Sequence, residues 1–287
     1  MIPANFDYVT VKSLDEALSL LAKHKDDAKI LAGGHSLLPA MKLRLAQPSL
    51  LIDLSRVKDL SYIREEGGTV KIGAMTTHFQ IESSELLKRI CPLLNETATH
   101  LGDMQVRNKG TMGGSLAHAD PAADWPAAVL ALGAEMVAVS PKGERVIKAE
   151  DFFVEMMTSA LEPGEILKEI RFAAPKGKFG QAYVKFRHPA SGFAVVGIAV
   201  NLAAEGSKCG SCAVGVTGVA AKPYRAKGVE SAMKGAALDG KTMAAAADHV
   251  ADGVRANTDL FASGEYRKHL AQVYTRRALE MAAGRAK

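Results

Sequence analysis

Two short segments with consecutive glycines, far apart in the chain, place the strongest constraint on the fold. They read AGGHS at residues 32–36 and TMGGS at residues 111–115, about eighty residues apart. Consecutive backbone N–H groups in such turns form a concave site for phosphate oxygens, and glycine lets the backbone approach a ligand without a Cβ. One glycine pair alone is more often an ordinary turn. Two pairs, each beside hydroxyl-bearing residues, predict a fold that brings both segments together around a ligand with two phosphates, such as a dinucleotide pyrophosphate.

Neither segment fits the common nucleotide-binding patterns. No G-x-G-x-x-G occurs in the chain, which argues against the Rossmann dinucleotide site. Residues 235–242, GAALDGKT, match the phosphate loop of nucleoside triphosphatases. That loop follows a buried strand, whereas here the polar, helical stretch VESAMK precedes it. We therefore expect this segment to link two helices, with Asp239-Gly240 as its turn.

Composition narrows the class of protein. The chain has 287 residues, 48% of them hydrophobic, which is enough for two domains or for one large and one small domain. Its net charge is +5, but Lys and Arg are scattered and only 6% of residues are aromatic, so we expect no nucleic-acid partner. No stretch approaches the roughly 18 apolar residues of a membrane span, and the N-terminus lacks the features of a secretory signal. The expected location is the cytoplasm.

The three cysteines, Cys91, Cys209 and Cys212, are too few for a disulfide framework or a four-ligand metal centre. The last two form a C-x-x-C pair in CGSC, which we interpret as small residues in a tightly packed strand. We therefore expect no metal site on this chain.

Candidate acid–base groups are equally sparse. His35, His118 and His188 have no histidine partner at metal-binding spacing, so we expect solvated or supporting roles for them. Asp120 and Asp124 are four residues apart beside the second glycine segment, but acidic residues are favoured at helix starts in any case. We expect no catalytic residue on this chain.

The hydrophobic pattern predicts an α+β fold with a domain boundary near residues 174–178, where Pro, Gly and Lys accumulate. We place one domain at 1–177, with subdomains at about 1–55 and 56–177, and a second at 178–287. The first domain mixes short strands with helices at 14–23, 84–100 and 123–132 and a hairpin around Gly67-Gly68. In the second, three long strands (181–188, 193–205 and 209–220) precede three helices (225–234, 242–255 and 265–283), which predicts a three-stranded antiparallel sheet with a helix layer.

Taken together, AGGHSLLPAMKLRLAQP and QVRNKGTMGGSLAHADPAADWPA resemble the FAD-binding medium subunit of the molybdenum hydroxylases, the family of aerobic carbon monoxide dehydrogenase and xanthine dehydrogenase. The resemblance covers the whole chain. It implies a two-loop FAD-binding domain of the PCMH, or vanillyl-alcohol-oxidase, type. It also implies the residues that contact FAD. Around the pyrophosphate these are Ala32, Gly33, Gly34, His35, Ser36 and Leu37 from the first segment and Thr111, Gly113, Gly114, Ser115, Ala117 and Asp120 from the second. Nearer the flavin they are Asp124, Leu161, Lys185 and Phe193.

The resemblance implies a function in a complex. A large molybdenum subunit oxidises the substrate, a small subunit with two [2Fe–2S] clusters relays the electrons, and FAD on this chain passes them to an external acceptor, in a dimer of heterotrimers. Two alternatives are a free-standing FAD-dependent oxidase of the related fold and a non-catalytic, FAD-dependent assembly subunit. Relatives close to carbon monoxide dehydrogenase carry a K-R-K run and a Tyr where this chain has KFRH at 185–188 and Phe193. We therefore do not assign carbon monoxide as the substrate from the sequence.

Overall fold

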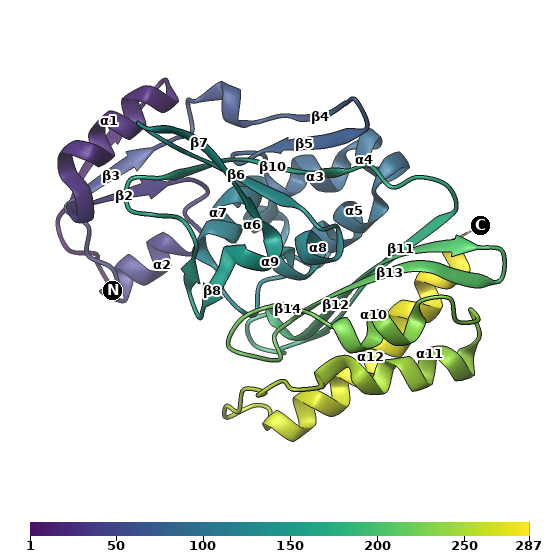
Figure 1. The fold of residues 1–287 in the computed structure, drawn as a ribbon. Coiled ribbons are helices and arrows are strands. Elements are labelled where there is room, and N and C mark those ends of the chain that lie inside the picture. Colours follow the sequence, from purple (N-terminus) through teal and green to yellow (C-terminus); the bar gives the residue numbers. More distant parts are fainter. Residues whose placement is uncertain (287) are drawn as a thin grey trace.

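The computed structural model describes residues 1–286, in which two α+β parts pack side by side (Figure 1). The chain begins with β1 (Asp7–Thr10), α1 (Leu14–His24), the 3-10 turn η1 (Lys25–Asp27), β2 (Ala28–Leu31), α2 (Leu37–Lys42) and β3 (Leu50–Asp53). The three strands are parallel, in the order β1-β3-β2. Ser13 starts α1 by accepting a hydrogen bond from the Glu16 N–H, so the helix start expected from the sequence is confirmed.

A five-stranded antiparallel sheet follows, in the order β4-β5-β10-β6-β7. After the 3-10 turn η2 (Lys58–Leu60), its strands are β4 (Ile63–Glu66), β5 (Thr69–Gly73), β6 (Glu135–Ser140), β7 (Gly143–Lys148) and β10 (Ile166–Ala173). The helices below this sheet in Figure 1 are α3 (His78–Ser83), α4 (Glu85–Ile90), α5 (Pro92–Thr99), α6 (Met104–Lys109), α7 (Met112–His118) and α8 (Trp125–Ala131). Sheet and helices share one hydrophobic core, in which Trp125 is fully buried.

Local chemistry divides two segments that we predicted as single elements. The expected helix at 84–100 is two helices, because Cys91 is not helical and Pro92 starts a new helix at α5. The run ERVIKAEDFF at 144–153 predicts a single strand, but the strand ends at Lys148 and the chain continues as the short helix α9 (Ala149–Phe152). A small hairpin then follows, formed by β8 (Phe153–Glu155) and β9 (Thr158–Ser159).

The C-terminal sheet has four strands rather than the predicted three. Its order is β11 (Phe179–Arg187), β12 (Ala194–Glu205), β13 (Lys208–Thr217) and β14 (Tyr224–Arg225), all antiparallel. The fourth strand has two residues, too few to show an alternating pattern in the sequence. Helices α10 (Lys227–Met233), α11 (Gly240–Ala247) and α12 (Gly264–Arg285) cover the sheet, with the 3-10 turn η3 (Asp248–Ala251) after α11, where we expected the helix to continue to 255.

The C-terminal sheet is sandwiched between its own helices and the helices of the N-terminal part. Helix α12 packs on one face, and α5 and α8 pack on the other. The contact with α8 is between backbones, since a Cβ on Gly215 would lie 2.0 Å from the carbonyl oxygen of Ala127. Among residues 1–286, no helix combines the length and the apolar character that crossing a bilayer requires.

Candidate functional site

The fold brings the two glycine segments into direct contact. A Cβ on Gly33 would lie 2.4 Å from the carbonyl oxygen of Lys109 and 2.6 Å from the Cα of Gly110. A Cβ on Gly114 would lie 3.3 Å from the Cβ of Ala32. Such separations are too short for any side chain at position 33, so glycine there allows backbone to meet backbone. The predicted convergence of the two segments is confirmed.

The first segment is an open row of hydrogen-bond donors. It connects β2 to α2, and no N–H group of residues 32–37 donates a hydrogen bond to any other group within residues 1–286. Gly34 adopts a left-handed backbone, with φ of +75°. The His35 ring folds back so that Nδ1 is 2.9 Å from the carbonyl oxygen of Gly33. None of residues 32–37 is buried, so these donors are accessible to a ligand, and a phosphate group can accept several of them at once.

The second segment differs from our expectation of a second open row. Its glycines lie in the first turns of α7, which Thr111 caps by accepting a hydrogen bond from the Gly114 N–H at 3.1 Å. The N–H groups of Met112 and Gly113 donate to the carbonyl oxygens of Thr76 and Ala74. These donors are thus already used, and Gly113 is buried, because a Cβ there would lie 2.4 Å from that of Ala74. Of the residues expected at the pyrophosphate from this segment, Thr111 and Gly113 are buried, and Gly114, Ser115, Ala117 and Asp120 are partly exposed.

Sequence reasoning missed residues 74–78, which hold the second segment in place. This stretch follows β5 and pairs with residues 110–113 through backbone hydrogen bonds, including one from the His78 N–H to the carbonyl oxygen of Gly110 at 3.0 Å. Backbone pairing of this kind leaves no mark on residue type. The only residue in this stretch whose type could have drawn attention to it is His78.

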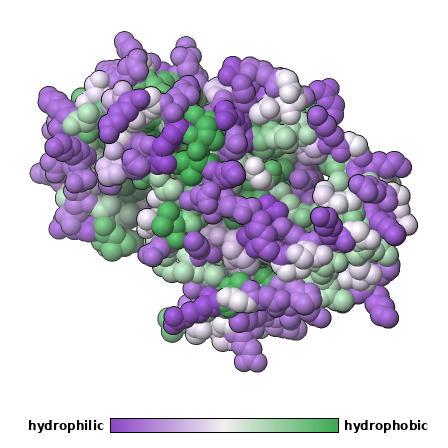
Figure 2. Space-filling view, viewed as in Figure 1, coloured by the Kyte–Doolittle hydropathy of each residue, from purple (hydrophilic) through white to green (hydrophobic). Residues whose placement is uncertain are grey.

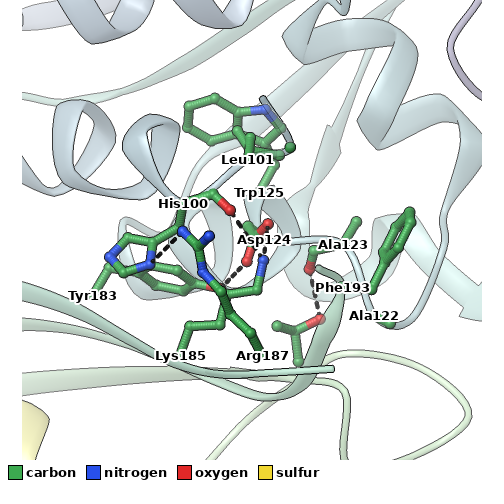
Figure 3. Close-up of polar contacts among 12 residues, drawn as sticks. His100, Leu101, Ala122, Ala123, Asp124, Trp125, Tyr183, Lys185, Arg187 and Phe193 are labelled. Carbon is green, nitrogen blue, oxygen red and sulfur yellow. Dashed lines mark hydrogen bonds and ion pairs between the residues drawn. The ribbon is translucent and has the colours of Figure 1, made fainter. Parts of the chain in front are cut away.

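A buried ionic cluster lies where the two parts of the chain meet (Figure 3). Lys185 Nζ is 2.8 Å from Asp124 Oδ2, and the two side chains are 1% and 4% exposed. The Tyr183 hydroxyl donates a hydrogen bond to the other carboxylate oxygen of Asp124. Burial raises the pKa of Asp124 and lowers the pKa of Lys185, and their mutual attraction opposes both shifts. Burial, and then the Asp124 carboxylate, raise the pKa of Tyr183 well above its ordinary value.

The cluster continues to the surface through His100 and Arg187. Lys185 Nζ also donates to the His100 carbonyl oxygen at 3.2 Å, and Arg187 Nη2 is 3.4 Å from His100 Nδ1. A groove of about 600 Å³ opens onto the cluster, with α12 as its other wall, and its lining includes Tyr183, Lys185 and His100. Burial, followed by the nearby positive charges of Arg187 and Lys185, lowers the pKa of His100.

A second pocket contains Phe193, in the turn between β11 and β12. The pocket has a volume of about 270 Å³, and its walls come from Pro121 and Ala122 of the N-terminal part and from the C-terminal part. The ring of Phe193 is 45% exposed. Asp120 turns the backbone towards this pocket by accepting a hydrogen bond from the Ala122 N–H at 2.8 Å. Leu161 is half-buried and follows β9, which packs against α7.

Other motifs singled out in the sequence have structural roles. Residues 235–242 connect α10 to α11, and the Asp239 side chain caps α11 by accepting the Thr242 N–H, so the expected link between helices is confirmed. Cys209 is buried in β13 and Cys212 lies on the same strand. Nδ1 of His188 accepts backbone hydrogen bonds from Ala190 and Ser191. Within residues 1–286, no three His, Cys, Asp or Glu side chains are grouped as a metal site.

The fold and the donor row define a chain suited to a cofactor with two phosphates, and comparison with known proteins identifies that cofactor as FAD. Residues 4–175 match the family described as the FAD binding domain in molybdopterin dehydrogenase, and residues 181–282 match the CO dehydrogenase flavoprotein C-terminal domain. The chain is 41% identical to the carbon monoxide dehydrogenase medium chain of Afipia carboxidovorans, with both chains covered in full. It is 37% identical to subunit alpha of the 6-hydroxypseudooxynicotine dehydrogenase complex of Paenarthrobacter nicotinovorans, covering 100% of this chain and 97% of that one.

Solved structures give the same result. The corresponding chain of carbon monoxide dehydrogenase from Hydrogenophaga pseudoflava superposes with a TM-score of 0.97 at 41% identity, with both chains covered in full. The chain of quinoline 2-oxidoreductase from Pseudomonas putida 86 superposes with a TM-score of 0.94 at 33% identity, covering 100% of this chain and 99% of that one. The protein therefore belongs to the family of FAD-binding medium subunits of molybdenum hydroxylases, which are oxidoreductases.

Proposed function

We propose that this chain is the FAD-carrying subunit through which electrons leave a three-subunit molybdenum hydroxylase. It takes electrons from the [2Fe–2S] clusters of a small partner subunit and passes them to an external acceptor, while a large partner subunit oxidises the substrate. FAD, when bound, supplies a redox centre that can exchange electrons singly or in pairs. The observation that carries the proposal is the row of six unpaired backbone N–H groups at residues 32–37, set against a second glycine segment.

The residues of this chain have separate tasks in the proposal. The N–H groups of residues 32–37 bind the pyrophosphate, and Gly114 and Ser115 form the opposite wall. Gly113 acts by close packing rather than by contact with the cofactor, because it is buried against Ala74. Asp120 and the pocket at Phe193 would hold the rest of the cofactor, and the Phe193 ring would offer a flat apolar surface to the flavin.

Exposed apolar side chains beside this cradle support docking of a partner. Leu43 and Leu45, just after α2, are 52% and 80% exposed. Met156 and Met157 form the tip of the β8–β9 hairpin, which is tied to the end of α7 by a hydrogen bond from the Met157 N–H to the Ala119 carbonyl oxygen at 3.2 Å. Figure 2 shows strongly hydrophobic patches over the N-terminal part of an otherwise mostly hydrophilic face. Such patches commonly mark protein interfaces.

The proposed complex is a dimer of heterotrimers in the cytoplasm, and we place the domain boundary of this chain at residues 177 and 178, in the gap between the two family matches. Its substrate is set by the large subunit. The two relatives above are named for carbon monoxide and for an alkaloid, at 41% and 37% identity, so similarity of this chain does not select between such substrates.

The test is to remove FAD from the assembled complex without touching the other subunits. Gly33→Val in this chain places a side chain against the Lys109 carbonyl oxygen and should give a complex without FAD. Substrate should still reduce the [2Fe–2S] clusters, as seen by electron paramagnetic resonance, while turnover with an external acceptor should be lost. Acceptor turnover at the wild-type rate in the FAD-free complex would overturn the proposal. Reduction of the isolated, FAD-loaded chain by substrate would instead identify a free-standing oxidase.

A further inference from the structure

We propose that His78 is a positioning residue that sets the spacing between the two glycine segments and thereby the affinity of the chain for FAD. The inference rests on the cradle proposed above. It concerns a side chain that is 4% exposed and that lies at the centre of a stack of close contacts.

The first contact joins the ring of His78 to the second glycine segment. A Cβ on Gly110 would lie 2.6 Å from His78 Nε2, so the imidazole sits directly on the Gly110 backbone. The same two residues are joined by the hydrogen bond from the His78 N–H to the Gly110 carbonyl oxygen. Gly110 is therefore held by both the backbone and the ring of His78.

The second contact joins Gly110 to the first glycine segment, so the position of Gly110 determines that of Gly33. A Cβ on Gly33 would lie 2.6 Å from the Cα of Gly110, on the stretch that His78 supports. Ring, Gly110 and Gly33 thus form a stack without intervening side chains. A displacement of the ring moves the backbone of Gly110, and Gly33 must follow, together with the N–H groups beside it. Close-packed interiors transmit such displacements.

The third contact fixes the ring itself. The indole N–H of Trp125 donates a hydrogen bond to His78 Nδ1 at 3.1 Å, and the ring centroids are 5.8 Å apart. Because Nδ1 accepts this bond, the proton of the neutral imidazole lies on Nε2, next to Gly110. Trp125 is fully buried in the main hydrophobic core, so the His78 ring is anchored to that core.

The charged and titratable groups around His78 favour this neutral state. Burial above all, with smaller contributions from His35 on the first segment and Arg107 on α6, lowers the pKa of His78 to about 4. A neutral imidazole can accept the Trp125 hydrogen bond at neutral pH, whereas a protonated one cannot.

The experiment compares His78→Leu and His78→Gln in the full chain, reconstituted with FAD. Leucine cannot accept the indole hydrogen bond, and we expect the Kd for FAD to rise about tenfold. Glutamine can accept it through its amide oxygen and should stay within about threefold of wild type. Trp125 is the only tryptophan, so its fluorescence reports directly on this contact and should change in the leucine variant but much less in the glutamine variant. His249→Gln, at an exposed histidine of the C-terminal part, is the matched control.

Two outcomes would overturn the inference: His78→Leu binding FAD as tightly as wild type, or His78→Gln binding it as weakly as His78→Leu. If the leucine variant does not fold, the pH profile decides. Wild type should lose FAD affinity as the pH falls to about 4 and His78→Gln should not, so identical profiles would refute the role. Failure of the cradle is distinguishable, since Gly33→Val would then retain FAD whatever the result at His78.

Discussion

The ammonium nitrogen of Lys185, on β11, lies 2.8 Å from a carboxylate oxygen of Asp124, at the start of α8, and both side chains are shielded from water. The family resemblance implies that Lys185 lies near the flavin, and the structure shows that its positive charge is paired with Asp124. Its field beyond the pair is largely cancelled by Asp124, so its main contribution is to the junction between the two parts of the chain.

Lys185→Met should therefore destabilise the protein by about 3–5 kcal/mol, because it leaves the Asp124 carboxylate buried without its cation. Adding Asp124→Asn should restore much of that loss, since the double variant has no buried charge at this position. Chemical denaturation of the single and double variants measures the difference. Equal stability of Lys185→Met and wild type would show that Lys185 and Asp124 do not form this ion pair in solution.

Tyr183→Phe should cost about 1.5–3 kcal/mol, the range for a hydrogen bond to a charged group. Tyr224→Phe is the matched control, because the Tyr224 hydroxyl is also largely buried but donates to a neutral acceptor, the Val250 carbonyl oxygen at 3.2 Å. Its loss should cost about 0.5–1.5 kcal/mol. A smaller effect at Tyr183 than at Tyr224 in denaturation experiments would contradict the charged hydrogen bond.

Gly34→Ala should weaken FAD binding at least about tenfold, since loss of even one well-placed donor costs this much. The left-handed backbone at Gly34 strains any other residue by about 1–2 kcal/mol, and relief of that strain displaces the adjacent N–H groups. Gly68→Ala carries the same strain at φ of +78°, in an exposed hairpin turn, and should leave FAD binding unchanged. Titration of both variants with FAD tests this, and equal affinities would argue against the donor row as the binding site.

Acid should destabilise the protein through His78. Its pKa is about 4 in the folded chain, below its ordinary value of 6.5, so the unfolded chain binds the proton more tightly. The contribution to stability, about 3 kcal/mol, is complete above pH 6.5 and is lost as the pH falls towards 4. Unfolding free energies across this range should fall less steeply for His78→Gln than for wild type. Parallel curves would rule out His78 as the source.

Lys241→Ala should change neither FAD content nor turnover, despite its place in a phosphate-loop pattern. The nearby Asp239 side chain caps α11, so Asp239→Ala should lower the free energy of unfolding by about 1 kcal/mol. Flavin absorbance and thermal unfolding of the two variants separate these effects. Loss of FAD in Lys241→Ala would reopen a nucleotide-binding role for this link.

Features that depend on residue type were accessible from the sequence. The two glycine pairs that include Gly33 and Gly114 together predicted a close approach of two segments, because glycine lets one backbone approach another without a Cβ. The long strands of the C-terminal part were visible in their apolar runs, and Pro92 could have signalled the break between α4 and α5.

Features that depend on main-chain pairing or on distant partners were not accessible. The support at residues 74–78 acts through backbone groups that every residue has. The pairing of Lys185 with Asp124 joins positions sixty-one residues apart, and nothing local to either position specifies it. We predicted a loop at the second glycine pair, which the structure shows as the start of α7. The backbone groups that hold it there belong to Ala74 and Thr76, almost forty residues earlier, and a local sequence pattern does not reveal them.

The backbone contact between Gly215 and Ala127 has a mechanical consequence. Many enzymes bind a ligand in an open state and then close two lobes over it. Here the two parts meet main chain to main chain, on the helix that begins just after the paired Asp124, so rotation of one part against the other would break a backbone contact that no side chain cushions. We therefore expect the two parts to keep one arrangement once the chain has folded, so that a cofactor bound between the glycine segments would meet a preformed site rather than a pair of closing lobes.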